Sequence, residues 1–355
     1  GAGGARGGRA GTGGPGRPRR AVSPNRLYRA LCDDEQRQGR RFRALVLHDA
    51  EDMVHPAALQ AIDAALGAVD FVQLPVRPGL LPQSRWIAGH YADEFPESHA
   101  KALVVRGALG ASLPAAGVGC GFARGALARL AERRRGAGEA DAGPFAPECL
   151  TEDYELGLVL SAEGRGSAFL RLRDADGTLV ATSSYFPAQL DQAVRQKTRW
   201  IHGIALQGWE RLGWSMQPVE LWMALRDRRG PLTALVLVAA YLLLVIDAVL
   251  LAGEAWSGQV LFIPLSAPAQ AMVTLSLFGL GWRLLARLVF TAREYGLAEG
   301  LLAVLRVPVA NVIAIMAARR AVGAYFHSLG GGEVVWDKTE HAAHPASTQL
   351  AKVQA

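Results

Sequence analysis

The sequence predicts an α/β domain that is followed by transmembrane α-helices, and two observations support this prediction. Residues 26–215 alternate segments of helical periodicity with short strand-like segments, which is typical of α/β domains. A nearly unbroken apolar run then begins at Pro231, and its roughly 22 residues are enough to cross about 30 Å of hydrocarbon.

Local patterns predict the individual elements of the α/β domain. Residues 25–38 carry apolar side chains at helical spacing, and residues 55–68 form a second helical pattern that a proline opens. Short apolar runs at residues 44–47 and 70–76 predict strands. Residues 167–186 predict two more strands, which a turn at Asp174-Ala175-Asp176-Gly177 would join.

Residues 216–296 form the predicted membrane region, with spans near residues 231–252 and 260–282. The second span is less apolar and contains two prolines, which membrane helices tolerate. Arginines flank the two spans at their outer ends: Arg226, Arg228 and Arg229 before the first, and Arg283, Arg287 and Arg293 after the second. Because the intervening loop GEAWSGQ has no Lys or Arg, the positive-inside rule places the N-terminal domain in the cytoplasm.

A third apolar stretch, Gly300–Ala318, is predicted to be an interfacial helix within the C-terminal part, residues 297–355. If this stretch crossed the membrane, Arg319 and Arg320 would emerge on the outer side, against the positive-inside rule. A third span is the alternative interpretation.

Charge and composition exclude some classes of function. Residues 1–20 contain nine glycines, five arginines and no acid, so we expect residues 1–25 to be a leader without a fixed fold. These arginines account for most of the net charge of +6, and the rest of the chain does not predict a nucleic-acid partner. The three cysteines are widely spaced, which predicts neither a disulfide framework nor a CxxC-type zinc site and favours a reducing cytoplasm.

Three acids follow the predicted strand at residues 44–47 within a few positions: Asp49, Glu51 and Asp52. Ligands of open α/β sheets bind beyond the carboxyl ends of strands, which is where these acids fall. Closely spaced carboxylates can converge on one divalent cation, Mg²⁺ or Mn²⁺, which would neutralise a diphosphate leaving group. A solvated acidic turn is the alternative.

Two later motifs strengthen the interpretation of a catalytic site. The phrase LTEDYELGLVL places Thr151, Glu152 and Asp153 at the start of an amphipathic helix, where they could instead be capping residues. The phrase RQKTRWIHGIALQGW places Gln196 and Arg199 on one helix face beside Trp200. Arginine there can bind a diphosphate and tryptophan can stack on a sugar, although an amphipathic helix lying on the membrane would have the same pattern.

The order of these motifs, an acidic metal motif, Thr-Glu-Asp, Gln-x-x-Arg-Trp and then membrane spans, resembles the membrane-embedded family 2 glycosyltransferases, typified by cellulose, chitin and hyaluronan synthases. Further phrases that carry the resemblance are YADEFPESHAKALVVRGALGASLPAAGVGCGFAR, RDRRGPL and WDKTEH, so that it runs from about residue 25 to residue 345. The resemblance implies a GT-A type, Rossmann-like catalytic domain in residues 26–215.

The resemblance also implies roles for individual residues. Asp49 would contact the nucleotide, and Glu51, helped by Asp52, would bind the metal. Asp153 would be the general base for an inverting transfer. The remaining assignments are substrate-binding residues and a gating loop: Gln196 and Arg199 at the donor pyrophosphate, Trp200 on the acceptor sugar, Glu152 at the substrate, and Trp336 and Thr339 in the loop.

The implied function is transfer of a sugar, of hexosyl type, from a UDP-linked nucleotide sugar to a growing glycan for an exopolysaccharide or envelope polysaccharide. The implied location is the inner membrane of a bacterium, as a multi-pass protein in contact with lipid and with an outer-membrane or periplasmic export partner. The competing interpretation is a catalytically dead membrane scaffold, or a component of a phage receptor or secretion complex, that retains the transferase fold.

One departure from the family concerns the segment before Asp49. Family members have a strand, a helix and a second strand there, roughly a hundred residues long, which bind the base through an early aspartate, whereas only 48 residues precede Asp49 in this sequence. We therefore expect that the catalytic domain is partial and that the chain as written does not bind a nucleotide sugar tightly.

Overall fold

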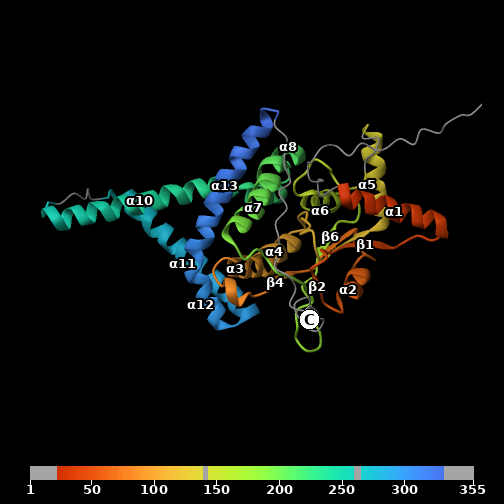
Figure 1. Cartoon of the computed structure of the whole chain (residues 1–355), viewed down its shortest axis with the longest axis horizontal. Coiled ribbons are helices and arrows are strands. Elements are labelled where there is room, and N and C mark those ends of the chain that lie inside the picture. Colours follow the sequence, from red (N-terminus) through yellow and green to blue (C-terminus); the bar gives the residue numbers. More distant parts are fainter. Residues whose placement is uncertain (1–21, 139–142, 260–264, 332–355) are drawn as a thin grey trace, which may run out of the picture.

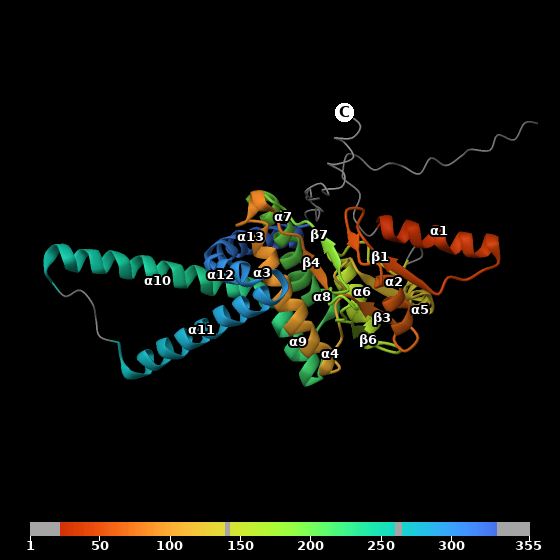
Figure 2. The same ribbon diagram turned by 90° about the horizontal axis from the view of Figure 1, so that it is seen from below.

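The computed structural model describes residues 22–138, 143–259 and 265–331. Two long helices, α10 (Gly230–Ser257) and α11 (Ala267–Tyr295), project from one side of an α/β body (Figures 1 and 2). Most of the predicted leader and both predicted gating residues, Trp336 and Thr339, lie outside the described residues. The predicted fold class, an α/β domain followed by apolar helices, is confirmed.

The larger sheet contains four strands in the spatial order β1 (Ala44–Leu47), β5 (Cys120–Ala123), β3 (Phe71–Gln73) and β6 (Ser167–Phe169). Strand β5 runs antiparallel to both of its neighbours, whereas β3 and β6 are parallel, so the sheet is mixed. Phe71 and Phe122 are register partners whose rings stack with centroids 5.0 Å apart, and both belong to the main hydrophobic core. Burial of this aromatic pair stabilises the centre of the sheet.

The smaller sheet contains three strands in the order β2 (Met53–Val54), β7 (Thr182–Ser184) and β4 (Val76–Pro78). Three segments of the chain each supply one strand to the larger sheet and the next strand to the smaller one: β1 then β2, β3 then β4, and β6 then β7. Each connection therefore crosses from one sheet to the other, and the acidic turn after β1 is the first of them.

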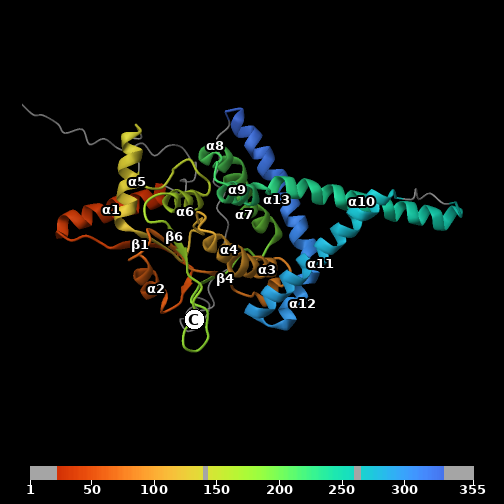
Figure 3. The same cartoon turned by 180° about the vertical axis from the view of Figure 1, so that it is seen from behind.

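The helices around the sheets come first from the N-terminal half: α1 (Val22–Gln38), α2 (Ala58–Ala65), α3 (Gly89–Glu97), α4 (Leu103–Ala108), α5 (Arg124–Gly136) and α6 (Glu152–Ala162). A 3₁₀ turn, η1 (Pro82–Ser84), precedes α3, and a π-helical turn, η2 (Ser98–Ala102), joins α3 to α4. Helices α1, α2 and α5 lie at the end of the body opposite the tip of α10 (Figure 3).

The C-terminal half supplies α7 (Leu190–Ile201), the π-helical turn η3 (His202–Gln207), α8 (Gly208–Leu212), α9 (Pro218–Arg228), α12 (Leu297–Leu305) and α13 (Val307–Leu329). Three helices, α10, α11 and α13, are long and apolar enough to cross a membrane, with mean hydropathies of 2.8, 1.5 and 1.3. Leucine side chains along α10 and α11 are largely exposed, as expected of helices that contact lipid.

The helix in the region of the predicted second span has bounds that differ from those of the predicted span. Helix α11 begins at Ala267 rather than near residue 260, with Pro268 in its first turn, where the missing N–H of proline costs no hydrogen bond. It continues beyond residue 282 to Tyr295, because Arg283, Arg287 and Arg293 are compatible with a helix. A left-handed glycine, Gly296 with φ +92°, ends it.

Two strand predictions need correction. Residues 70–76 do not form one strand, because the chain leaves the larger sheet after Gln73 and β4 begins only at Val76, beyond Pro75. The turn at Asp174–Gly177 is present, since the Gly177 N–H donates to the Asp174 carbonyl at 3.0 Å. However, β6 and β7 on either side of it belong to different sheets, and only an isolated bridge, Arg173 to Leu179, pairs the two arms directly.

The stretch Gly300–Ala318 is not one helix, because it is divided between α12 and α13 at Arg306. Helix α13 packs on α7, where Ile313 and Ala317 join a buried cluster with Val194 and Tyr91. Whether α13 crosses the membrane or lies at its surface, this packing places one of its faces on the α/β body.

Candidate functional site

A cavity of about 430 Å³ lies where the smaller sheet meets α3, α4, α6, α7 and α9. Five of the residues expected to take part in catalysis or in binding of metal or substrate line it: Asp49, Asp153, Gln196, Arg199 and Trp200. They come from the turn after β1, the start of α6 and the second half of α7. The fold therefore brings together in one cavity three motifs that are far apart in the chain.

The turn after β1 is closed by the side chain of Asp52. Its Oδ2 accepts a hydrogen bond from the Asp49 backbone N–H at 2.9 Å, and its own N–H donates to the Asp49 carbonyl at 3.1 Å. The Asp52 side chain is only 1% exposed, so this acid of the turn is shielded from solvent. Asp52 shapes the turn that presents Asp49 to the cavity, while neither Glu51 nor Asp52 is among the described residues that line it.

The carboxylates of the same turn are suited to binding a divalent cation. No group of three or more His, Cys, Asp or Glu side chains suited to a metal occurs within residues 22–138, 143–259 and 265–331. The Oδ1 atom of Asp52 is nevertheless buried without a hydrogen-bond partner among those residues. One or two carboxylates plus phosphate oxygens are a common Mg²⁺ environment, so Asp49 and Asp52 fit such a site.

The start of α6 places Asp153 in the cavity wall. Thr151 is the N-cap residue of α6 and is buried, and its side chain forms no capping hydrogen bond within the described chain. Thr151 therefore stands at the N-cap position, as the alternative interpretation had it, but its side chain does not cap the helix. Glu152 is 3% exposed and is not in the described lining of the cavity, so Asp153 is the acid of this motif that lines it.

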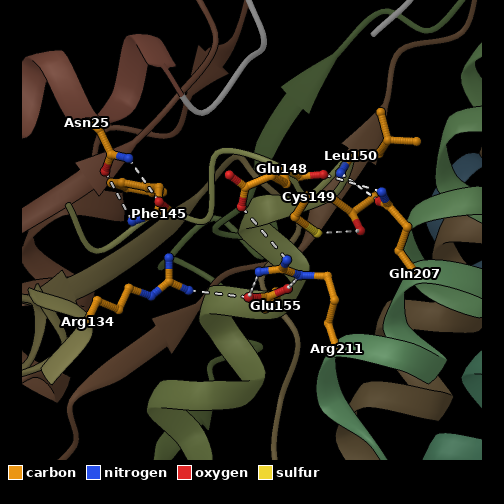
Figure 4. A network of polar contacts seen from close by, with 10 residues as sticks. Asn25, Arg134, Phe145, Glu148, Cys149, Leu150, Glu155, Gln207 and Arg211 are labelled. Atoms are coloured by element: carbon orange, nitrogen blue, oxygen red, sulfur yellow. Dashed lines mark hydrogen bonds and ion pairs between the residues drawn. The ribbon is translucent and has the colours of Figure 1, made fainter. Parts of the chain in front are cut away.

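Glu155, two residues after Asp153, anchors α6 through a buried ion-pair network (Figure 4). Its carboxylate accepts from Arg211 Nε at 2.7 Å and Nη2 at 3.0 Å, and from Arg134 Nη2 at 3.2 Å. Burial works to raise the pKa of Glu155, but the hydrogen bonds and charges of Arg211 and the charge of Arg134 outweigh it, so the pKa is lowered. This charged network connects α5, α6 and α8.

Helix α7 is fixed against α3 beside the cavity. Lys197 Nζ donates to both carboxylate oxygens of Glu94, at 2.8 and 2.6 Å. The ring of Trp200 meets Tyr91 and Phe186 edge-on, with centroids 6.1 and 6.4 Å apart. Because Trp200 packs in this aromatic cluster and also lines the cavity, α7 is more than an amphipathic helix with a tryptophan at the membrane surface.

Three further polar residues of the cavity carry no role in the sequence analysis: Arg106, Tyr154 and Asp227. Arg106 Nη1 and the Tyr154 hydroxyl each donate to Asp227 Oδ2 at 2.7 Å. Burial, followed by the Asp227 carboxylate, raises the pKa of Tyr154 well above its usual range, so its hydroxyl stays protonated as a donor. In the sequence, Asp227 is the acid of the phrase RDRRGPL, and it was the signal that could have pointed to this group of residues. The sequence analysis used that phrase only for its arginines and for its resemblance to the family.

Comparisons with known proteins agree with this architecture. A family model described as "Glycosyl transferase family group 2" matches residues 44–317. Bacteriophage adsorption protein B of Escherichia coli strain K12 and bacteriophage N4 adsorption protein B of Escherichia coli O157:H7 are each 32% identical to the chain over 337 residues. These alignments cover 89% of the chain and 44% of each relative, so the chain spans less than half the length of the curated relatives it matches.

Proposed function

Because the chain belongs to family group 2 of the glycosyltransferases, we propose that it transfers a sugar, of hexosyl type, from a UDP-linked nucleotide sugar to a glycan acceptor. The proposed location is the bacterial inner membrane with the α/β domain in the cytoplasm, and the proposed product is an exopolysaccharide or envelope polysaccharide. Three helices long enough to cross a membrane support a membrane enzyme.

The observation that carries this proposal is the convergence of Asp49, Asp153, Gln196, Arg199 and Trp200 in one cavity. Inverting sugar transfer needs a base near the acceptor, cations near the diphosphate and a surface on which a sugar ring stacks. All three kinds of group line the cavity. A scaffold would have no need to keep them together.

In the proposed reaction, Asp153 removes the proton from the acceptor hydroxyl as its oxygen attacks the anomeric carbon. The bond between that carbon and the diphosphate oxygen breaks, and the diphosphate leaves with the electron pair. Arg199 and Gln196 bind the diphosphate, and the guanidinium stabilises the negative charge that develops on it. Trp200, oriented by Tyr91 and Phe186, stacks on the acceptor sugar.

A divalent cation, Mg²⁺ or Mn²⁺, is part of the proposal. When bound, it would neutralise charge on the diphosphate. Asp49 and Asp52 would hold it, consistent with the free buried oxygen of Asp52, and Glu51 remains a predicted ligand. Calorimetric titration of Mg²⁺ into wild-type and Asp52→Asn proteins tests these assignments without any assay of activity.

The deciding experiment compares Asp153→Asn with wild type, each expressed as the product of the natural gene and held in lipid nanodiscs. Each protein is assayed with a panel of UDP-sugars. We expect Asp153→Asn to lower the rate of UDP release by about 10²- to 10⁴-fold, the usual contribution of a general base, and to keep UDP binding. Arg199→Gln should weaken UDP binding, and the exposed Asp176→Asn serves as the matched control. An unchanged rate in Asp153→Asn would exclude the proposed base.

The 355-residue chain by itself is a separate test of the expectation of weak donor binding. Micromolar affinity of this purified chain for a UDP-sugar would contradict that expectation and leave the proposed reaction intact.

The names of the two relatives support a second candidate, a membrane component needed for phage adsorption, in which the transferase fold acts as a scaffold for an envelope partner. Asp153→Asn distinguishes the two candidates in cells. Loss of polymer supports the enzyme, whereas unchanged polymer together with unchanged phage adsorption supports the scaffold.

A further inference from the structure

A second cavity, of about 410 Å³, lies on the opposite side of the smaller sheet from the candidate active site. Val76 and Ser184 line the first cavity, whereas their strand neighbours Arg77 and Ser183 line the second. Successive side chains of a strand point to opposite faces, so β4 and β7 form a wall that the two cavities share. No residue proposed for sugar transfer belongs to the described lining of the second cavity.

The second cavity carries an excess of positive charge. Its charged lining consists of three guanidinium groups and one carboxylate, a net charge of +2: Arg77, Arg173, Arg293 and Glu294. These residues come from β4, from the loop between β6 and β7, and from the last turn of α11. A basic concave surface with low-dielectric walls concentrates anions.

Glu294, the carboxylate in the described lining of the cavity, already interacts with more than one arginine side chain. Glu294 is 7% exposed, pairs with Arg171 and lies 3.5 Å from Arg173 Nη2. Arg77 is held by another route, since its guanidinium lies 4.8 Å from the centroid of the Tyr295 ring and donates to the Glu294 carbonyl at 3.4 Å. The guanidinium of Arg77 is therefore preorganised by a ring and a carbonyl rather than neutralised by an acid of its own.

His55 forms an uncharged part of the wall. Its Nδ1 accepts a hydrogen bond from the Ala57 N–H at 3.1 Å, which requires the neutral ring to carry its proton on Nε2, and Nε2 lies 3.2 Å from Asp174 Oδ2. Asp174 is thereby engaged by His55, and the excess charge of the cavity comes from the arginines alone.

We propose that this second cavity is a binding site for a small anion that carries a phosphate group, with Arg77, Arg173 and Arg293 as its ligands. A phosphate monoester carries about −1.5 to −2 charges at neutral pH, which matches the net charge of the lining. The planar guanidinium group also suits the geometry of phosphate oxygens. Because Arg293 belongs to α11 and Arg77 to β4, the bound anion connects an apolar helix to the wall of the candidate active site.

The test is calorimetric titration of inorganic pyrophosphate into the full chain in nanodiscs of neutral phosphatidylcholine. Every protein carries Arg199→Gln, so that the candidate active site contributes little to the signal. We expect this protein to bind pyrophosphate at one site and Arg173→Gln/Arg293→Gln to weaken that binding at least tenfold. The control pair Arg26→Gln/Arg319→Gln removes the same charge from exposed positions on α1 and α13 and should leave the affinity unchanged.

Arg173 and Arg293 are suited to substitution because both are exposed, and equal melting temperatures of the variants would show that folding is unaffected. Absence of pyrophosphate binding in the Arg199→Gln protein, or equal affinity after Arg173→Gln/Arg293→Gln, would overturn the proposal. Titration of the protein with Arg199 intact reports separately on the proposed transferase site, so failure of one proposal is distinguishable from failure of the other.

The phosphate group could belong to a lipid headgroup or to a soluble compound, and the lipid composition separates these sources. If a headgroup occupies the cavity, nanodiscs that contain phosphatidylglycerol should weaken pyrophosphate binding by competition. If the natural ligand is soluble, the affinity should be the same in both kinds of nanodisc.

Discussion

Glu155→Gln is expected to destabilise the protein without removing any group that takes part in sugar transfer. Glu155 lies two residues after Asp153 on α6, but its carboxylate binds Arg211 and Arg134 instead of facing the cavity (Figure 4). Glutamine keeps the shape of the side chain and loses its charge. Two guanidinium groups would then remain beside a neutral amide in a largely buried place.

The expected magnitude follows from the burial of the three partners. Removing one partner of a buried ion pair costs about 3–5 kcal/mol. The side chains of Glu155 and Arg134 are 8% and 12% exposed, but that of Arg211 is 31% exposed and is partly screened by water. We therefore expect a loss of about 2–3 kcal/mol, which for an unfolding unit of some 200 residues lowers the Tm by about 4–12 °C.

The pH dependence identifies the cause of this loss. The pKa of Glu155 is lower in the folded protein than the ordinary value of 4.5 for a glutamate, so the stabilisation is present above that value and is lost as the pH falls below it. The difference in Tm between wild type and Glu155→Gln should therefore be full at pH 7 and smaller below pH 4.5.

Thermal unfolding in nanodiscs, followed by intrinsic fluorescence, measures this difference. Glu132→Gln, an exposed acid on α5, is the matched control, and Asp153→Asn is the comparator that should lose transfer while keeping its Tm. A Tm of Glu155→Gln equal to that of the wild type at pH 7 would refute the structural role assigned to the network. A difference that persists undiminished at low pH would refute the electrostatic explanation.

Two other predictions concern the walls of the cavity. Gly157→Ala should lower both the stability, by about 1–3 kcal/mol, and the rate of UDP release, because an added Cβ would lie 2.1 Å from the Ala115 nitrogen and push α6 outward. The control is Gly125→Ala on α5, whose Cβ would meet no atom closer than 3.7 Å. Equal losses in both variants would contradict the steric explanation. Burial lowers the pKa of His99 to about 3, and its Nδ1 accepts a hydrogen bond from the Val76 N–H at 2.9 Å. As the pH is lowered from 6.5 to 3, only the unfolded chain gains a proton at His99. The free energy of unfolding therefore decreases as the pH is lowered, by about 2 kcal/mol at pH 5. His99→Asn keeps an acceptor and should flatten the decline in Tm between pH 7 and 5, whereas an unchanged slope would show that another group titrates.

Local patterns predicted those parts of the fold that depend on local physics. The strand at Ala44–Leu47 and the helices α1 and α2 are present because apolar periodicity and the flanking turn residues determine them. The division of the strands between two sheets was not predictable in this way. It depends on pairing between distant segments, such as β3 with β6, which leaves no mark on the local pattern.

The same distinction applies to the candidate site. Asp153 and Arg199 could be singled out because their motifs resemble those of a family, but the resemblance assigned no function to Asp227. Its place between Arg106 and Tyr154 depends on how α9 packs against α4 and α6, and an acid within an arginine-rich segment before a membrane span does not reveal that packing. Glu152 shows the converse, since it belongs to the motif and yet is absent from the described lining of the cavity.

Arg306 shows why residues 300–318 were difficult to interpret from the sequence. The prediction for this stretch rested on Arg319 and Arg320, whereas the structure buries Arg306 completely, with Nη2 at 3.0 Å from Asp93 Oδ1 and 2.7 Å from Glu299 Oε2. The charge is paired within the protein and is not exposed to lipid, so it does not decide whether α13 crosses the membrane. It fixes the start of α13 to α3, while Ile313 and Ala317 pack on the helix that carries Gln196, Arg199 and Trp200. Helix α13 thus supports the candidate site directly.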